Sequence, residues 1–150
     1  MGFTPAILDV NAEQLSIAGV VERIRSFSPR LICLVVYGQN PNSGTVNMSG
    51  AMKIANAAKI HGVDIPVCAV GSHISALPNE VLRNELSLDF VLCNEGVYAL
   101  RNVLATDLDD PNSFEGIRGI GYRQNGKAVL SEPEAVVPQD RMDKDLPGYA

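Results

Sequence analysis

The chain has 150 residues, which is the size of one domain and long enough to bury a hydrophobic core. Hydrophobic residues make up 46% of it but aromatic residues only 5%, so small aliphatic side chains must fill that core. The formal net charge of −5 and the lack of any Lys/Arg run argue against a nucleic-acid or anionic-membrane partner. No apolar run approaches the roughly 20 residues of a membrane span. No signal peptide opens the sequence, so a cytoplasmic protein is expected.

Strand and helix patterns alternate through the first two thirds of the chain. Residues 6–10 predict a short strand, and residues 11–27 a helix with apolar side chains at helical spacing. Residues 31–37 form the most hydrophobic run, continuous rather than alternating, which predicts a central strand buried on both faces. A polar loop at residues 38–45 then precedes a predicted helix of small residues from about Val46 to His61.

Two further strand–helix units follow. Residues 67–70 predict a second buried strand, and residues 79–86 a short helix. Residues 89–93 predict the next strand and residues 97–105 the helix after it. Four strand–helix repeats joined by short loops predict an α/β protein with a Rossmann-like (flavodoxin-like) parallel sheet and helices on both faces.

The pattern changes after Thr106. Two apolar segments, residues 117–122 and 128–130, flank an Asn125-Gly126 pair, which predicts a β-hairpin with a type I′ turn. The Rossmann-like domain is therefore expected at residues 1–130, with its hairpin at 117–130. Residues 131–150 contain three prolines and alternating charges, which predict an extended tail or linker.

The three cysteines, Cys33, Cys68 and Cys93, lie inside or at the end of predicted strands, and none belongs to a CxxC pair. Buried reduced thiols in cytosolic proteins have this distribution, so packing is favoured over metal binding or redox chemistry. His61 falls in the last turn of a helix, where a cation is favourable. No second ligand lies at zinc-site spacing from His73, so no protein metal site is predicted.

Three polar loops follow strands that should lie side by side, at residues 37–45, 71–75 and 94–96. The carboxyl ends of parallel strands meet at one edge of a sheet, so these loops should converge there. They contain glycine and uncharged hydrogen-bonding residues but no Lys or Arg, and neither GxGxxG nor GxxxxGK[ST] occurs. They favour a large, mostly apolar ligand with amide edges, with ordinary turns as the alternative.

Two of these loops lie in segments that resemble a known family. Residues 70–80, VGSHISALPNE, resemble the GGPHATALPEE segment of the cobalamin-binding domain in cobalamin-dependent radical SAM enzymes. Residues 89–100, DFVLCNEGVYAL, resemble the D-x-V-x-x-G-E-G-E-x-x-L segment of the same domain. Further similarities follow the family's order, at its I-x-D-A strand (7–10), its P-D-V-V strand entry (28–32), its I-x-G-I-x-Y-R-x-x-G hairpin (117–126) and its linker (145–147).

The resemblance implies a domain that holds cobalamin at the C-terminal edge of its sheet and presents the cobalt to a neighbouring radical SAM barrel. In the family, that barrel works with S-adenosylmethionine and an iron–sulfur cluster, and many members are methyltransferases. The chain is therefore predicted to be the corrinoid-binding N-terminal part of such an enzyme, without catalytic residues of its own. The residues expected to line the site are Tyr37, Gly38, Asn40, Ser43, Thr45, Gly71, Ser72, His73, Ser75, Glu95 and Gly96.

The chain departs from the family in several places. The cluster-binding CxxxCxxC is absent, and so is the D-x-H-x-x-G motif that places a histidine below cobalt. Ser72 replaces a proline, Asn94 a glycine and Val97 an acidic residue, which favours backbone contacts over a specific role for Glu95. The family also opens with a further strand that lies inside the sheet. Without it, the domain is expected to close the gap, form a homodimer through the sheet edge, or leave that edge exposed.

Two other classes of function stay open. A response-regulator-like or flavodoxin-like module needs a paired acidic phosphoacceptor or a flavin-phosphate loop. Asp9, however, has no paired carboxylate, and no Lys follows a late strand. A degenerate Rossmann-like interaction module without a cofactor is the second alternative.

Overall fold

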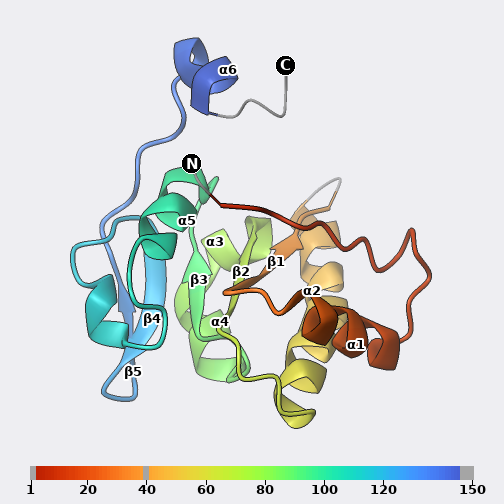
Figure 1. The fold of residues 1–150 in the computed structure, drawn as a ribbon. Helices are drawn as coiled ribbons and strands as arrows, with labels where there is room; N and C mark the ends of the chain where they lie inside the picture. Colours follow the sequence, from red (N-terminus) through yellow and green to blue (C-terminus); the bar gives the residue numbers. More distant parts are fainter. Residues whose placement is uncertain (1–2, 39–40, 146–150) are drawn as a thin grey trace.

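The computed structural model describes residues 3–38 and 41–145. Its elements in chain order are α1 (Ile17–Phe27), β1 (Ile32–Val36), α2 (Pro41–Ile60), β2 (Val67–Gly71), α3 (Ser72–Ala76), α4 (Pro78–Asn84), β3 (Phe90–Leu92), α5 (Val97–Leu104), the 3-10 helix η1 (Pro111–Phe114), β4 (Ile120–Gln124), β5 (Lys127–Leu130), the 3-10 helix η2 (Gln139–Arg141) and α6 (Met142–Asp145) (Figure 1). None of the helices in this part of the chain combines the length and the apolar character that a membrane span requires.

The five strands form one mixed sheet in the order β1-β2-β3-β4-β5. β1, β2 and β3 are parallel, whereas β4 runs antiparallel to β3 and β5 antiparallel to β4. Every residue of β2 and β3 is buried, as expected for parallel strands covered on both faces. Asn125 and Gly126 both have positive φ, which the predicted type I′ turn of the hairpin requires. The Rossmann-like fold class with its C-terminal hairpin is confirmed.

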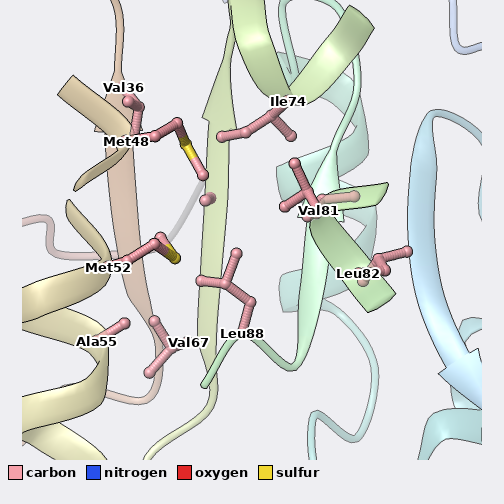
Figure 2. Close-up of a cluster of buried hydrophobic side chains, with 11 residues drawn as sticks. Val36, Met48, Met52, Ala55, Val67, Ile74, Val81, Leu82 and Leu88 are labelled. Atoms are coloured by element: carbon pink, nitrogen blue, oxygen red, sulfur yellow. The ribbon is translucent and has the colours of Figure 1, made fainter. Parts of the chain in front are cut away.

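Helices cover both faces of the sheet. On one face, α2, α3 and α4 pack Met48, Met52, Ile74 and Leu82 against the strands, and Figure 2 shows the two methionines directed toward β2. On the other face, α5 and η1 cover β3 and β4. There the Phe114 ring meets Phe90 and Tyr122 edge to face, with ring centroids 5.2 and 5.5 Å apart. α1 packs on α2 beside the sheet.

The predicted strand at residues 6–10 is wrong. This segment has no strand structure, and a turn at residues 10–14 leads to α1, which begins at Ile17 with Ser16 as its N-cap. A short apolar run becomes a strand only where a neighbouring strand pairs with it, and none of the described strands does. Leu8 and Val10 instead pack against the cluster between α1 and α2.

The prediction that β1 is central is also wrong, because β1 is an edge strand. Among the described residues only β2 pairs with it. Val35, on the sheet face opposite α2, is 70% exposed. The hydrophobicity of residues 31–37 was therefore not a sign that this strand lies in the centre of the sheet. Among the described strands β1 thus forms an exposed edge of the sheet, and a homodimer through that edge stays a prediction.

Helix α2 begins at Pro41, five residues before the predicted start at Val46. Proline is well suited to a first helical turn because it needs no N–H partner there and its φ is already helical. Ser43 and Thr45 are consequently helical rather than part of a loop. α3 was not predicted, and it follows β2 without an intervening loop. Both differences bring helix starts close to the ends of β1 and β2.

The segment at residues 131–138 has no regular secondary structure and is attached to the domain body. Gly119 N donates to the Glu132 carbonyl (2.8 Å), and Arg118 Nε donates to the Pro133 carbonyl (2.9 Å). Figure 1 shows the segment continuing past β4 toward α6. Residues 139–145 form the short helices η2 and α6, which the tail prediction did not anticipate.

Candidate functional site

The loops after β1, β2 and β3 meet at one edge of the sheet and are joined by hydrogen bonds. Thr45 Oγ1 lies 3.0 Å from His73 Nδ1, which links α2 to α3. Ser75 Oγ accepts from Asn94 N (2.9 Å), which links α3 to the loop after β3. We call this edge the carboxyl rim, formed by residues 37–38, 43–47, 71–75 and 94–96. The predicted convergence of the three loops is observed.

Tyr37 spans the carboxyl rim. Its hydroxyl donates to the Asn94 carbonyl (3.2 Å), and its own carbonyl accepts from Asn47 Nδ2 (2.9 Å). The side chain therefore connects the end of β1 with the loop after β3, while 49% of the residue stays exposed. Burial of part of the ring, followed by the nearby Glu95 charge, raises the pKa of the Tyr37 phenol, which keeps the hydroxyl in its donating form.

Glycines allow the rim loops to approach one another. A Cβ on Gly71 would lie 2.0 Å from the Val36 carbonyl oxygen, and one on Gly38 would lie 2.3 Å from Ser43 Cβ. A Cβ on Gly44 would lie 2.5 Å from Ser72 Oγ. Backbone therefore packs against backbone at the ends of β1 and β2.

Ser72 carries a buried hydroxyl at the carboxyl rim for which the structure provides no hydrogen-bond partner. An unpaired buried hydroxyl costs about 1–3 kcal/mol, so such groups are uncommon in folded proteins. Together with the glycine surface, this unmet hydrogen bond fits a ligand that carries hydrogen-bonding groups at its periphery. The residues present are therefore compatible with a corrinoid, whose ring edge carries amide side chains.

Glu95 has a partner within the chain. Its Oε2 accepts from Val137 N at 3.1 Å, so the carboxylate holds the segment at residues 131–138 against the loop after β3. Val137 is buried. Asn102 Nδ2 adds a second contact, to Glu134 Oε2 (3.3 Å). Two polar contacts thus hold residues 131–138, the C-terminal segment, beside the carboxyl rim. One comes from Glu95, just before α5, and the other from Asn102, near the end of α5.

We expect loss of the Glu95 carboxylate to release the C-terminal segment. A hydrogen bond to a charged acceptor contributes about 1.5–3 kcal/mol, so the Val137 amide should exchange about tenfold faster or more in Glu95→Ala. Glu95→Gln keeps an acceptor and should show a smaller effect. Hydrogen–deuterium exchange measures this, with the Ile32 amide, bound to the Pro66 carbonyl away from this segment, as the internal control. Equal exchange at Val137 in all three proteins would contradict the assignment.

The Tyr37 hydroxyl can be tested by Tyr37→Phe. Removing a partly exposed neutral hydrogen bond should lower the free energy of unfolding by about 0.5–1.5 kcal/mol, measured by urea denaturation. Val46→Ala, at an exposed position of α2, should change it by less than about 0.5 kcal/mol. An unchanged midpoint in Tyr37→Phe would mean that the contact with Asn94 does not stabilise the rim.

All the predicted site residues except Asn40 belong to the carboxyl rim. Asn40 lies outside the described residues. The others are placed at the end of β1 and the loop after it (Tyr37, Gly38), in the first turns of α2 (Ser43, Thr45), at the end of β2 (Gly71), in α3 (Ser72, His73, Ser75) and between β3 and α5 (Glu95, Gly96). Gly96 has a φ of +69° as the N-cap of α5, a conformation that glycine adopts without strain.

The predicted site residues did not include Gly44 and Asn94, although both lie in the predicted loops, and sequence reasoning missed Asn47 altogether. Placing the helix start at Pro41 would have shown that Gly44 and Asn47 lie near the end of β1. Asn94 has a φ of +58°, which asparagine tolerates better than most residues. An asparagine between a strand and Glu95-Gly96 was therefore a sequence signal for a tight turn at the rim.

A cavity of about 300 Å³ lies away from the carboxyl rim, near the starts of β2 and β3, and Lys59, Pro66, Asp89 and Tyr122 help to line it. Its charged groups already serve the fold. Asp89 Oδ2 accepts from Lys59 Nζ (3.0 Å) and from Val67 N (2.7 Å). The pocket beside Gly96 is far smaller. The rim is therefore an open surface, which suits a large ligand lying across it better than a small one enclosed in it.

No group of three or more His, Cys, Asp or Glu side chains in residues 3–38 and 41–145 is arranged to hold a metal ion. Uncharged residues dominate the rim, with His73 and Glu95 as the exceptions, and Lys and Arg are absent from it.

Comparisons with known proteins agree with this geometry. A family model described as the B12 binding domain matches residues 1–104. The uncharacterized methyltransferase PH0819 of Pyrococcus horikoshii is 27% identical over 143 residues, which cover 95% of this chain and 29% of that protein. The cobalamin-dependent radical SAM methyltransferase TokK of Streptomyces tokunonensis is 27% identical over 93 residues, covering 62% of this chain and 14% of that protein.

The chain thus spans less than a third of the length of either curated relative. The matched family segment includes β1, β2, β3 and all three rim loops. The resemblance seen at residues 70–80 and 89–100 is therefore confirmed. Because the match extends over more than half of the chain, this protein belongs to the B12-binding domain family.

Proposed function

We propose that the chain binds cobalamin across the carboxyl rim and is the cobalamin-binding part of a radical SAM methyltransferase. The observation that carries this proposal is the rim itself, in which three glycine-bearing loops without Lys or Arg are joined by hydrogen bonds into one surface. The family match and the methyltransferase relatives support the same ligand and the same class of reaction.

The residues of the rim would act by binding and orientation. Gly38 and Gly71 let the loops that would contact the ring pack closely against each other, and the buried Ser72 hydroxyl has no hydrogen-bond partner among the described residues. The contact between His73 Nδ1 and Thr45 Oγ1 fixes the orientation of the imidazole at the rim. When bound, cobalamin supplies a cobalt-carried methyl group, while the protein supplies position and shielding from water.

A phosphoacceptor role for Asp9 is not favoured. Asp9 does not follow a strand of the sheet, and its Oδ1 accepts from Asn11 N (3.1 Å) and Ala12 N (2.9 Å). The carboxylate therefore stabilises the turn before α1. A response-regulator-like phosphoacceptor would instead need an acidic residue at the end of a central strand.

Cobalamin binding is tested directly with hydroxocobalamin. The protein should co-elute with it in gel filtration, and the visible absorption bands of the corrinoid should shift on binding. Elution of all corrinoid at the small-molecule volume, with the protein shown to be folded by circular dichroism, would contradict the proposal.

Two serine variants test the location of the site, since Ser72 and Ser87 both have buried hydroxyls without partners. Replacing either with alanine removes an unsatisfied polar group, so each should leave the free energy of unfolding unchanged or raise it by up to about 1 kcal/mol. Only Ser72→Ala should weaken hydroxocobalamin binding, by several-fold, because Ser87 lies before β3 at the opposite end of the strands. Equal affinities of the two variants for hydroxocobalamin would mean that the corrinoid does not bind near Ser72.

The radical SAM context has a separate test in the coding sequence that follows Ala150. A CxxxCxxC segment within the next domain is expected. A continuing reading frame that encodes a further domain without this cysteine pattern would remove the radical SAM assignment while leaving corrinoid binding intact.

A further inference from the structure

Cys33 in β1 and Cys68 in β2 face each other across the parallel strand pair. They are Cα partners in its register, so their side chains stand on the same face of the sheet. Adjacent strands lie about 4.8 Å apart, and disulfide-bonded cysteines have Cα atoms about 4.4–6.8 Å apart. Both cysteines are free. Two reduced thiols are thus held at a separation that a disulfide can bridge.

The two thiols differ in access to solvent. Cys68 is completely buried, whereas Cys33 is half-buried in the edge strand. Val35, two residues further along the same face of β1, is exposed, so this part of the face is not covered by a helix. A small reagent would therefore reach Cys33 first and find Cys68 directly behind it.

The pKa values of the two thiols also favour Cys33, the more accessible cysteine, as the first to react. The hydrogen bond from Cys68 lowers the pKa of Cys33, while burial raises the pKa of Cys68 well above its ordinary value. Thiolates rather than thiols attack disulfides, so the accessible cysteine is also the better nucleophile. Cys93 follows β3 and is half-buried, and burial raises its pKa, which makes it the less reactive of the two accessible cysteines.

We propose that Cys33 and Cys68 form a redox-active thiol pair, which closes to an intramolecular disulfide by exchange with a small disulfide of the glutathione type. Cys33 loses its proton and attacks one sulfur of the small disulfide, whose other half leaves as a thiol. Cys68 then loses its proton and attacks the Cys33 sulfur, which releases the second half as a thiol. The protein gives up two S–H bonds and gains one S–S bond, and the small disulfide is reduced to two thiols.

The fold leaves room for this closure. Among the described strands, β1 pairs only with β2, so it can shift toward Cys68 without breaking a second strand pair. The product would join β1 to β2 three residues before Val36 and Gly71, just below the carboxyl rim. A small thiol in excess would reverse it. The inference does not depend on cobalamin binding.

The test uses the folded chain and an excess of oxidised glutathione, followed by acid quenching and intact mass measurement. The expected product has lost the mass of two hydrogen atoms and carries no glutathione, and peptide mapping should find Cys33 linked to Cys68. Treatment with dithiothreitol should restore the original mass. A wild-type product that keeps one glutathione, a link that includes Cys93, or no reaction of the folded chain would overturn the proposal.

Three variants define the roles of the cysteines. Cys68→Ser should stop at the mixed disulfide and gain one glutathione on Cys33, because the resolving thiol is gone. Cys33→Ser should form neither product, and Cys93→Ser should behave as the wild type. Circular dichroism checks that each variant is folded, and Cys68→Ala replaces Cys68→Ser if the buried hydroxyl prevents folding. Failure of Cys68→Ser and Cys68→Ala to trap an adduct on folded protein would contradict the assigned order of attack.

Discussion

Replacing Gly71 with alanine is expected to destabilise the domain by about 3 kcal/mol or more and to abolish corrinoid binding. The added Cβ would lie 2.0 Å from the Val36 carbonyl oxygen and 2.8 Å from the Val36 carbonyl carbon. Backbone atoms of a packed strand cannot turn aside as the end of a flexible side chain can. β1 must therefore move away from β2 at the carboxyl rim, which separates the surfaces that the ligand would contact.

Gly50→Ala is the matched control for this experiment. Gly50 is in α2, and a Cβ there would have no atom within 4 Å. The substitution should raise the free energy of unfolding by about 0.5–1 kcal/mol, because alanine favours the helix over glycine. Urea denaturation followed by circular dichroism measures both variants, and hydroxocobalamin co-elution is then compared under conditions where each is folded. Equal stabilities for the two variants would mean that the Gly71 contact is not required.

Arg123→Met is expected to lower the free energy of unfolding by about 3 kcal/mol. The Arg123 guanidinium donates to the carbonyls of Leu82, Glu85 and Leu88, with a distance of 2.9 Å to Glu85. These carbonyls belong to the end of α4 and the turn before β3, where no further helical turn can satisfy them. Burial lowers the pKa of Arg123, as expected for a cation enclosed by the protein. Its loss removes the guanidinium donor from the Leu82 and Leu88 carbonyls, each at a cost of about 1 kcal/mol or more, whereas the Glu85 carbonyl still accepts from Leu88 N.

Lysine at position 123 should recover only part of this stability, because an ammonium group does not reproduce the planar fork of a guanidinium. The control is Arg83→Met, which removes an exposed arginine from α4 itself and should change the free energy of unfolding by less than about 0.5 kcal/mol. Both are measured by urea denaturation. Similar midpoints for Arg123→Met and Arg83→Met would show that α4 does not depend on Arg123.

The sequence predicted the elements whose pattern is local. Continuous apolar runs identified β2 and β3, and Asn125-Gly126 identified the hairpin, because strand burial and turn conformation follow from a few neighbouring residues. The convergence of the three rim loops also followed, since parallel strands with helical crossovers bring their carboxyl ends to the same edge.

The predictions that failed concern which segments of the chain pair or pack together, which a local sequence pattern does not specify. Residues 6–10 were predicted to be a short strand and residues 31–37 a central one, but whether a segment forms a strand, and where it lies in the sheet, depends on which strands pair with it. The helix start was placed five residues late because Asn42, Ser43 and Gly44 are typical of loops. These residues are helical because they pack against the end of β1. The helix propensities of single residues do not take such packing into account.

The sequence by itself determined the chain order of the five strands and of α1, α2, α4 and α5, the lack of Lys and Arg in the rim loops, and the resemblance to cobalamin-binding domains. Only the tertiary structure decided which distant groups meet. Glu95 binds Val137, 42 residues away, and Arg123 binds carbonyls 35 to 41 residues away. The pairing of Cys33 with Cys68 likewise depends on the register of β1 on β2. Register and crossover geometry are properties of the assembled sheet, so no local pattern of residues encodes these contacts.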